Sequence, residues 1–130
     1  MKDGDLLVFS GVRGHSSFQT ELALTEETKR RGLMYRDGLP KNTGMFFLNT
    51  DPPKRRSMWM PNMRFPLDIV WLDGTLKIVS IRYDCQPCTS TGDCPSISSI
   101  KKCQHAIEFA AGEVKALGLR EGDRLKLIKN

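Results

Sequence analysis

The chain has 130 residues, of which 39% are hydrophobic and 27% charged, and it carries 20 basic against 15 acidic side chains. This length fits one domain, residues 1–130, and the apolar content excludes intrinsic disorder. The chain contains no run of about 20 apolar residues, so we expect no membrane span. Only four apolar residues follow Asp5, too few for the core of a signal peptide. We therefore expect a cytoplasmic protein, unless an export signal has been removed.

The net charge of +5 is dispersed along the chain. Short basic clusters stand at residues 29–31, 54–56 and 101–102, and none alternates with aromatic residues as a surface for single-stranded nucleic acid would. Nucleic-acid binding is therefore not expected from the composition.

Short strands are the main pattern along the chain. After a short apolar run at 6–9, residues 18–24 alternate, with Phe18, Leu22 and Leu24 on one face. The other strands are expected, in chain order, at residues 45–48, 57–60, 67–72, 76–81, 104–109 and 124–128. About seven short strands with little helix between them predict a mainly β sandwich or barrel rather than alternating β and α units.

Two short helices and a hairpin turn are expected among these strands. Thr25 is a typical N-cap for a helix over residues 26–31, whose acidic start and basic end suit the helix dipole. Gly32 can end this helix in the left-handed conformation. A second helical turn ends at Gly118, and Asp73-Gly74 predicts a two-residue type I′ turn between two strands.

Several segments together resemble one known family. Residues 32–36, Gly-Leu-Met-Tyr-Arg, resemble its GLMxR signature, residues 58–63 its WMxN segment and residues 65–69 its PLDI segment. Further matching segments stand, in the family's order, at residues 25–27, 44–47, 106–112 and 118–123. The sequence from about residue 18 to residue 130 is therefore similar to the uncharacterised domain-of-unknown-function family 192. The resemblance implies a compact, jelly-roll-like β domain and no established biochemical activity.

Two features depart from the family pattern. Pro61 and Met63 replace the usual lysine and threonine around Asn62, so no role of those two side chains carries over. The loop expected at residues 83–103 is richer in cysteine than the family pattern requires. Part of this protein's chemistry therefore lies outside the family description.

Four polar residues stand where the surrounding sequence is apolar: Arg36, Asn62, Asp68 and Glu108. A buried charge or amide needs a partner, since burying it alone costs several kcal/mol. One interpretation is a pocket in which Arg36 and Asn62 hold a ligand and the two carboxylates accept hydrogen bonds. The other is structural, with Asn62 and Asp68 binding backbone N–H groups of the loop 61–66 while Arg36 pairs with a carboxylate.

The leading functional hypothesis is a non-enzymatic binding module. Its pocket would add Met34, Trp59 and Met60 to the four polar residues and take a small polar ligand or a protein segment. The alternative is an enzyme that uses Asp68 and Glu108, or a metal at the cysteines, as its reacting centre. We do not favour the enzyme, because no histidine stands in the family-like segments with a triad or metalloprotease spacing.

The methionines are clustered as well. Met58, Met60 and Met63 follow one another beside Trp59, and such a spacing of thioethers suits Cu(I). Methionine also fills irregular gaps in protein cores, and the family pattern already accounts for Met60. Cu(I) binding is therefore a minor alternative.

The four cysteines form the pattern Cys85-x2-Cys88-x5-Cys94-x8-Cys103. Four converging thiolates hold structural zinc, and Cys85-x2-Cys88 is typical of the first half of such a site. Two disulfides would equally stiffen a long loop, with three possible pairings. The Cys-Gln-Pro-Cys segment also resembles a thioredoxin-type redox element, but no helix pattern follows it. Zinc and disulfides are both compatible with this spacing.

Overall fold

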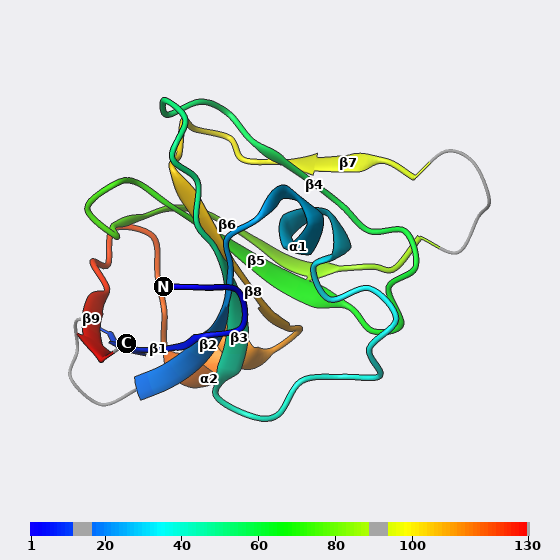
Figure 1. The fold of residues 1–130 in the computed structure, drawn as a ribbon, viewed down its shortest axis with the longest axis horizontal. Helices are drawn as coiled ribbons and strands as arrows, with labels where there is room; N and C mark the ends of the chain where they lie inside the picture. The colour runs from blue at the N-terminus through cyan, green and yellow to red at the C-terminus, as the bar shows by residue number, and fades with distance from the viewer. Residues whose placement is uncertain (12–16, 89–93, 130) are drawn as a thin grey trace.

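The computed structural model describes residues 1–11, 17–88 and 94–129. These residues form short strands with two short helices among them (Figure 1). The elements, in chain order, are β1 (Leu6–Ser10), β2 (Ser17–Ala23), α1 (Glu26–Arg31), β3 (Thr43–Phe47), β4 (Ser57–Trp59), β5 (Leu67–Leu72), β6 (Ile78–Cys85), β7 (Ser96–Ser98), β8 (His105–Ala110), α2 (Glu113–Leu117) and β9 (Lys126–Lys129). The mainly β class with two short helices is therefore confirmed.

Seven of the described strands form one sheet in the order β6-β5-β8-β3-β2-β1-β9, and β4 pairs with β7 in a second sheet. Within the large sheet, β2 and β3 run parallel, while the other neighbouring strands are antiparallel. The segment before β9 reaches the start of β6, where the Ile78 N–H donates to the Asp123 carbonyl at 2.7 Å. The Leu125 N–H likewise donates to the Leu76 carbonyl at 2.9 Å. These bonds draw the two edges of the sheet together at one end and make it barrel-like.

Apolar side chains pack on both faces of the large sheet. The inner face, toward α2, carries one buried cluster that includes Phe9, Leu22, Phe46, Val70, Ile107, Phe109 and Val114. The outer face carries a second cluster that includes Leu33, Met45, Phe47, Met60, Met63, Ile69 and Trp71. Two residues of this outer cluster, Leu33 and Met60, come shortly after α1 and directly after β4. These two elements therefore cover the outer face, as Figure 1 shows. The space between the sheet and this cover holds the candidate site.

The N-cap of α1 and its end at Gly32 are confirmed, but Gly32, with ψ of −126°, is not in the expected left-handed helical conformation. The Thr25 hydroxyl accepts a hydrogen bond from the Thr28 N–H at 3.3 Å, and the Thr28 hydroxyl accepts one from the Thr25 N–H at 3.2 Å. This reciprocal pair satisfies two N–H groups that the helix itself leaves free. Gly32 ends the helix with φ of +50°. Within the described residues, neither helix is long and apolar enough to cross a membrane.

The turn between β5 and β6 differs from the expected type I′ turn. A type I′ turn needs a positive φ at Gly74, but here the positive φ, +68°, falls on Leu76. The Asp73 carboxylate accepts hydrogen bonds from the Thr75 N–H at 2.8 Å and the Lys77 N–H at 3.0 Å. This side-chain bonding favours a longer turn, which the dipeptide signal alone does not reveal.

The expected loop 83–103 contains two pieces of regular structure. The strand expected to end at residue 81 continues to Cys85, and β7 pairs with β4 over Ser57 to Trp59. β7 has only three residues, with no long alternation to signal it. The tertiary pairing with β4 therefore decides its conformation.

Candidate functional site

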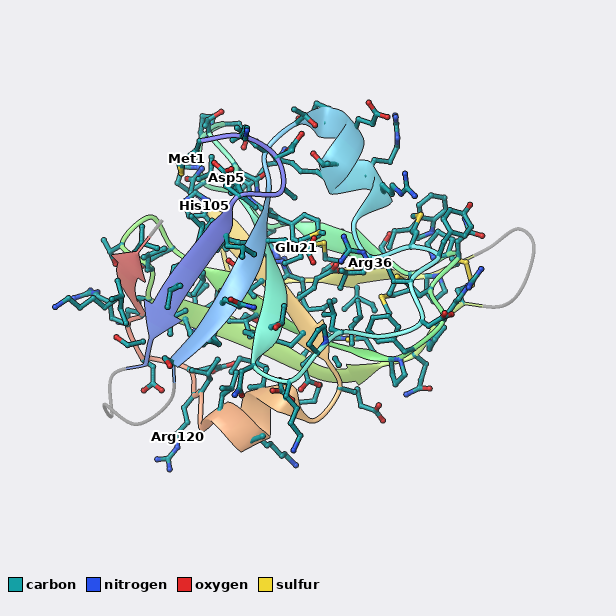
Figure 2. All side chains as sticks on the ribbon, turned by 60° about the horizontal axis from the view of Figure 1, so that its bottom comes forward. Met1, Asp5, Glu21, Arg36, His105 and Arg120 are labelled. Carbon is teal, nitrogen blue, oxygen red and sulfur yellow. A yellow bond between two sulfur atoms is a disulfide. The ribbon has the colours of Figure 1, made fainter. Side chains whose placement is uncertain are left out.

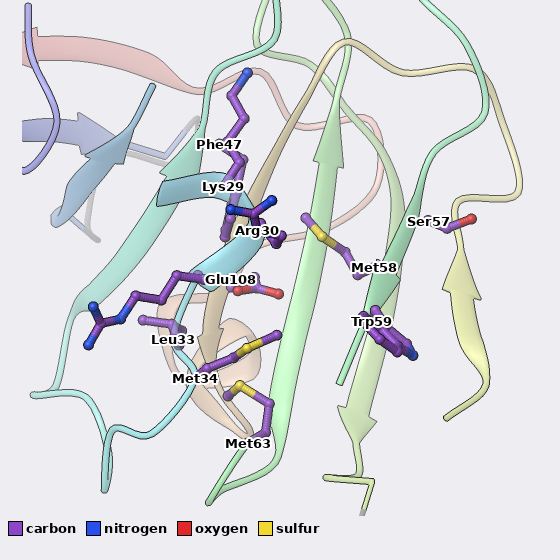
Figure 3. A pocket seen from close by; sticks show the side chains of 12 residues that line it. Lys29, Arg30, Leu33, Met34, Phe47, Ser57, Met58, Trp59, Met63 and Glu108 are labelled. Carbon is purple, nitrogen blue, oxygen red and sulfur yellow. The ribbon is translucent and has the colours of Figure 1, made fainter. Parts of the chain in front are cut away.

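A cavity of about 240 Å³ opens on the outer face of the sheet, between α1 and β4 (Figure 3). Its lining includes residues from α1 and the turn after it, from β3, from β4 and from β8. The lining includes the side chains of Lys29, Arg30, Met34, Phe47, Trp59 and Glu108. We call this space the Glu108 cavity.

Glu108 lies at the floor of this cavity. In β8 it pairs with Met45 of β3 on one side and with Ile69 of β5 on the other, so its carboxylate leaves the sheet from an apolar surface. The residue is only 5% exposed. No hydrogen bond or ion pair reaches this carboxylate within the described residues, and burial alone raises its pKa to about 8. Glu108 is therefore mostly protonated at neutral pH and can donate a hydrogen bond.

The backbone at Gly32 lies directly against this carboxyl group. A Cβ built on Gly32 would lie 3.6 Å from Oε1 of Glu108 and 3.4 Å from Cζ of Phe47. The positive φ of Gly32 is a conformation that side-chain-bearing residues rarely adopt. Gly32 thus turns the chain from α1 across the floor of the cavity and places Leu33 and Met34 in its wall.

The walls of the cavity are mainly apolar and flexible. Three thioether side chains line it, those of Met34, Met58 and Met63. Trp59 of β4 also belongs to the lining, with its side chain more than half exposed. The Trp59 indole N–H donates to the Cys94 carbonyl at 3.1 Å, which holds the ring in one orientation. Such a lining suits an apolar body with one or two polar atoms.

Asp68, expected in the same pocket, does not line the Glu108 cavity. It is 1% exposed, and its carboxylate accepts hydrogen bonds from the N–H groups of Asp84 at 2.9 Å, Gly112 at 2.9 Å and Val114 at 3.2 Å. These bonds join the end of β6 to the start of α2. They match the structural interpretation of this residue, with partners other than the loop 61–66. Asp68 also projects to the inner face, whereas Glu108 projects to the outer face, so the two carboxylates share no site.

The other predicted residues divide between packing and surface roles. Arg36 forms a two-pronged ion pair with Glu21, at 2.6 and 2.9 Å (Figure 2). Asn62 has a φ of +59°, and its carbonyl accepts from the Tyr35 N–H at 2.9 Å. Met60 is 2% exposed and packs in the outer cluster. Of the seven predicted ligand-binding residues, the structure brings Met34, Trp59 and Glu108 into the cavity lining.

The cysteines do not converge as expected. Cys88 and Cys94 form a disulfide, while Cys85 and Cys103 are buried free thiols. The described residues hold no group of three or more side chains that could bind a metal ion. The structure thus shows one disulfide and two separate thiols in this part of the chain, whereas the two interpretations of the sequence were four converging thiolates or two disulfides. The Cys85-x2-Cys88 redox pairing is not formed either.

The geometry of β5 explains why the two free thiols stay apart. Cys85 pairs with Leu67 at one end of this strand, and the residue after Cys103 hydrogen-bonds to Leu72 at the other end. Leu67 and Leu72 are five residue steps apart, which in an extended strand corresponds to roughly 16 Å. A disulfide requires Cα atoms closer than about 7 Å, so these thiols cannot be joined without moving the sheet.

Several lining residues were missed from the sequence. Lys29 and Arg30 were interpreted only as favourable charges at the end of α1, and Phe47 only as a strand residue, yet all three line the cavity. Gly32 was expected only to end the helix. The basic residues at the end of α1, followed by a glycine, are the sequence signal for a site at this position. That signal is informative only when the sheet face that α1 covers is known.

These residues define a class of structure. It is a barrel-like sheet with a cavity on its outer face, covered by a short helix and by a pair of short strands. Residues 8–127 match the family DUF192, described as an uncharacterized ACR, and the chain belongs to this family. No curated protein matches the chain.

Two solved structures are similar to this fold. One is a proposed transcription regulator from Sinorhizobium meliloti 1021, 27% identical, with a TM-score of 0.83 over 98% of this chain and 97% of that one. The other is a protein of unknown function from Novosphingobium aromaticivorans DSM 12444, 28% identical, with a TM-score of 0.78 over 93% of this chain and 83% of that one. Neither similarity supports a specific function for this chain.

Proposed function

We propose that this protein is a small-ligand-binding module and that the Glu108 cavity is its binding site. The observation that carries this proposal is the Glu108 carboxyl group, which is buried and without a hydrogen-bond partner among the described residues. Nearly all buried polar groups in proteins are hydrogen-bonded, and those that are not often belong to functional sites. A ligand atom that accepts a hydrogen bond from the protonated carboxyl group would supply the missing partner.

The size and lining of the cavity favour a small molecule over a protein segment. About 240 Å³ is the volume of roughly eight water molecules, at about 30 Å³ each, and is too small for several peptide side chains. Phe47, Trp59 and the methionines offer apolar contact, while Glu108 offers one directed polar contact. The ligand should therefore be an apolar small molecule with a hydrogen-bond acceptor.

The experiment is a thermal-shift screen of a small-metabolite library against four forms of the protein. Compounds that bind in the Glu108 cavity should raise the melting temperature of the wild type and of Glu108→Gln, which keeps a hydrogen-bond donor. They should lose most of this effect in Glu108→Leu, which fills the same space without polar atoms. Glu121→Leu is the matched control, because Glu121 is exposed and lies outside the cavity. Hits that bind Glu108→Leu as well as wild type would overturn the proposal.

Cu(I) is a second candidate ligand, because Met34, Met58 and Met63 line the same cavity. The charges around them argue against it, since Lys29 and Arg30 also line the space and repel a metal cation. A Cu(I) titration under reducing conditions decides between the two. Sub-micromolar binding that is lost in Met34→Leu and Met63→Leu would favour copper.

The name of the Sinorhizobium meliloti protein suggests DNA as a further partner to test. The dispersed basic clusters of this chain do not favour it, and nucleic-acid binding stays unexpected. A gel shift with duplex DNA is the check, and a shift at low salt that weakens steeply as salt rises would favour binding.

A further inference from the structure

We infer that the ligand is an amphipathic anion, whose apolar body occupies the Glu108 cavity and whose anionic group lies in a second, basic hollow next to it. The inference rests on the proposed function and names the chemical class of the ligand. Three observations support this assignment: the two spaces share part of their lining, the second one is lined mainly by cations, and a buried donor lies beside it.

The two spaces are adjacent and share part of their lining. The second hollow has a volume of about 420 Å³ and lies between α1, β4 and the segment that precedes β4. Lys29, Arg30, Phe47, Ser57 and Met58 line both spaces. We call the second space the basic hollow. In the proposed complex, one extended molecule reaches from one space to the other past Met58 and Phe47, which line both.

The basic hollow is lined by five cationic side chains and one carboxylate. The cations are Lys29, Arg30, Lys54, Arg55 and Arg56, and the carboxylate is that of Glu26. A surplus of positive charge in a concave space attracts anions more strongly than the same charges on a flat surface. The charge balance therefore favours an anionic group on the ligand.

Two of these cations have ion-pair partners, and the other three have none among the residues that the structure describes. Arg56 pairs with Asp51 at 3.0 Å and donates its Nε–H to the Cys103 carbonyl, and Lys54 pairs with Asp51 at 3.3 Å. Within the described residues, no carboxylate pairs with Lys29, Arg30 or Arg55.

Arg30 and Lys29 also line the Glu108 cavity, and so lie where the two spaces meet. A carboxylate or phosphate there would meet the unpaired cations without displacing an existing ion pair.

A buried hydrogen-bond donor lies beside the same hollow. Trp71 lines it and is 0% exposed, and its indole N–H has no acceptor in the described part of the chain. Donors left without a partner in a protein interior are costly. The cations and this N–H all call for oxygen acceptors, while the protonated Glu108 does not repel an anion.

The test compares four eight-carbon probes that differ only in the head group: octyl phosphate, octanoate, octanol and octylammonium. Trp59→Phe leaves Trp71 as the only tryptophan, so its fluorescence reports on the basic hollow, and calorimetry measures the affinities for the wild type. At low salt, octyl phosphate and octanoate should bind at least tenfold more tightly than octanol, and octylammonium more weakly. This preference should shrink as sodium chloride is added.

Charge variants locate the anionic group. The double variant Arg30→Gln/Arg55→Gln should reduce the preference for octyl phosphate over octanol to threefold or less. Lys101→Gln/Lys102→Gln is the matched control, because it removes two exposed cations outside the hollow and should preserve the preference. A preference that survives in the Arg30/Arg55 variant would overturn the assignment of the anion to this hollow.

The outcomes separate this inference from the proposed function. Saturable binding of octanol with no gain from the phosphate overturns the inference and leaves the Glu108 cavity as a ligand site. Inorganic phosphate that binds as tightly as octyl phosphate overturns the amphipathic character of the ligand. If none of the four probes binds and no library compound depends on Glu108, both proposals fail.

Discussion

Asp68 and Glu108 leave neighbouring strands of one sheet in opposite directions. Asp68 pairs with Phe109 and shares its inner face, whereas Glu108 pairs with Ile69 and shares its outer face. The first carboxylate is surrounded by three backbone donors, and the second has no partner within the described residues. The two residues therefore have different roles, and mutation should separate them.

Replacing Asp68 with alanine should destabilise the fold without affecting ligand binding. Removal of the carboxylate leaves the part-buried N–H of Gly112 and the buried N–H of Val114 without an acceptor at the start of α2. Hydrogen bonds to a charged acceptor contribute about 1.5–3 kcal/mol each, and not all of that is recovered by water. We expect a loss of about 2–4 kcal/mol in the free energy of unfolding, measured by urea denaturation.

The control for this change is Asp37→Ala. Asp37 also accepts a hydrogen bond, from Arg64 at 2.9 Å, but its side chain is 91% exposed. Exposed ion pairs contribute little to stability. The free energy of unfolding of this variant should therefore lie within about 0.5 kcal/mol of the wild-type value. An equal effect of the two substitutions would contradict the role assigned to Asp68.

Replacing Glu108 with glutamine should change how stability depends on pH. Burial raises the pKa of Glu108 in the folded protein from 4.5 to about 8. The folded state therefore holds this proton more tightly than the unfolded chain does, and wild-type stability falls as pH rises through this window. Each pH unit between the two pKa values costs up to about 1.4 kcal/mol. Above a pH of about 8 the loss is complete.

Glutamine has nearly the same shape and does not titrate. The difference in unfolding free energy between Glu108→Gln and wild type should therefore increase in favour of the variant from about pH 5 to pH 8 and then level off. Chemical denaturation at a series of pH values gives this curve. Parallel curves for the two proteins would show that Glu108 titrates normally.

Replacing Gly32 with alanine should destabilise the protein by about 1–3 kcal/mol, because a residue with a side chain is strained at this backbone conformation. The φ of Gly32 is +50° and its ψ is −126°. The added methyl group would contact Phe47 and the Glu108 carboxyl group at ordinary distances, so the strain is the main cost. Thermal and urea unfolding measure it.

Gly38→Ala provides the comparison. An added Cβ at Gly38 meets no atom within 4 Å, and its φ is not positive. Alanine there should leave stability unchanged or raise it slightly, by reducing the freedom of the unfolded chain. A loss at Gly38 as large as that at Gly32 would refute the conformational explanation.

The cysteine chemistry should show one disulfide and two protected thiols. Reduction should add about 2 Da to the intact mass, one hydrogen for each sulfur of Cys88 and Cys94. Alkylation of the unreduced protein should label Cys85 and Cys103 only after unfolding, because both are buried and burial raises the pKa of the Cys85 thiol to about 11. A gain of about 4 Da would contradict the pairing.

The disulfide also bears on the cavity, through the hydrogen bond from Trp59 to the Cys94 carbonyl. Cys88→Ser/Cys94→Ser removes a cross-link between residues six positions apart in the sequence. From the chain entropy we expect a loss of about 2 kcal/mol in the free energy of unfolding. The emission of Trp59 should shift with it. Unchanged stability and emission would show that the loop is held by other contacts.

Much of the local structure could be predicted from the residues themselves. The Thr25 cap, the strand alternation before it and the helix end at Gly32 depend on neighbours in the chain, and all three appear in the structure. The type I′ turn predicted at Asp73-Gly74 was wrong, because the Asp73 side chain accepts hydrogen bonds from backbone N–H groups beyond these two residues. β7 could not be predicted, since its partner β4 lies far away in the sequence.

The sequence by itself determined the family, the mainly β class and the apolar segments in which Asp68 and Glu108 stand. Only the tertiary structure decided which of these residues share a site. The side chains of a strand alternate between its faces, so the pairing register between β5 and β8 places Asp68 on one face and Glu108 on the other. The cover of the outer face, α1 and β4, then brings Lys29 and Trp59 to Glu108, across separations that no local pattern encodes.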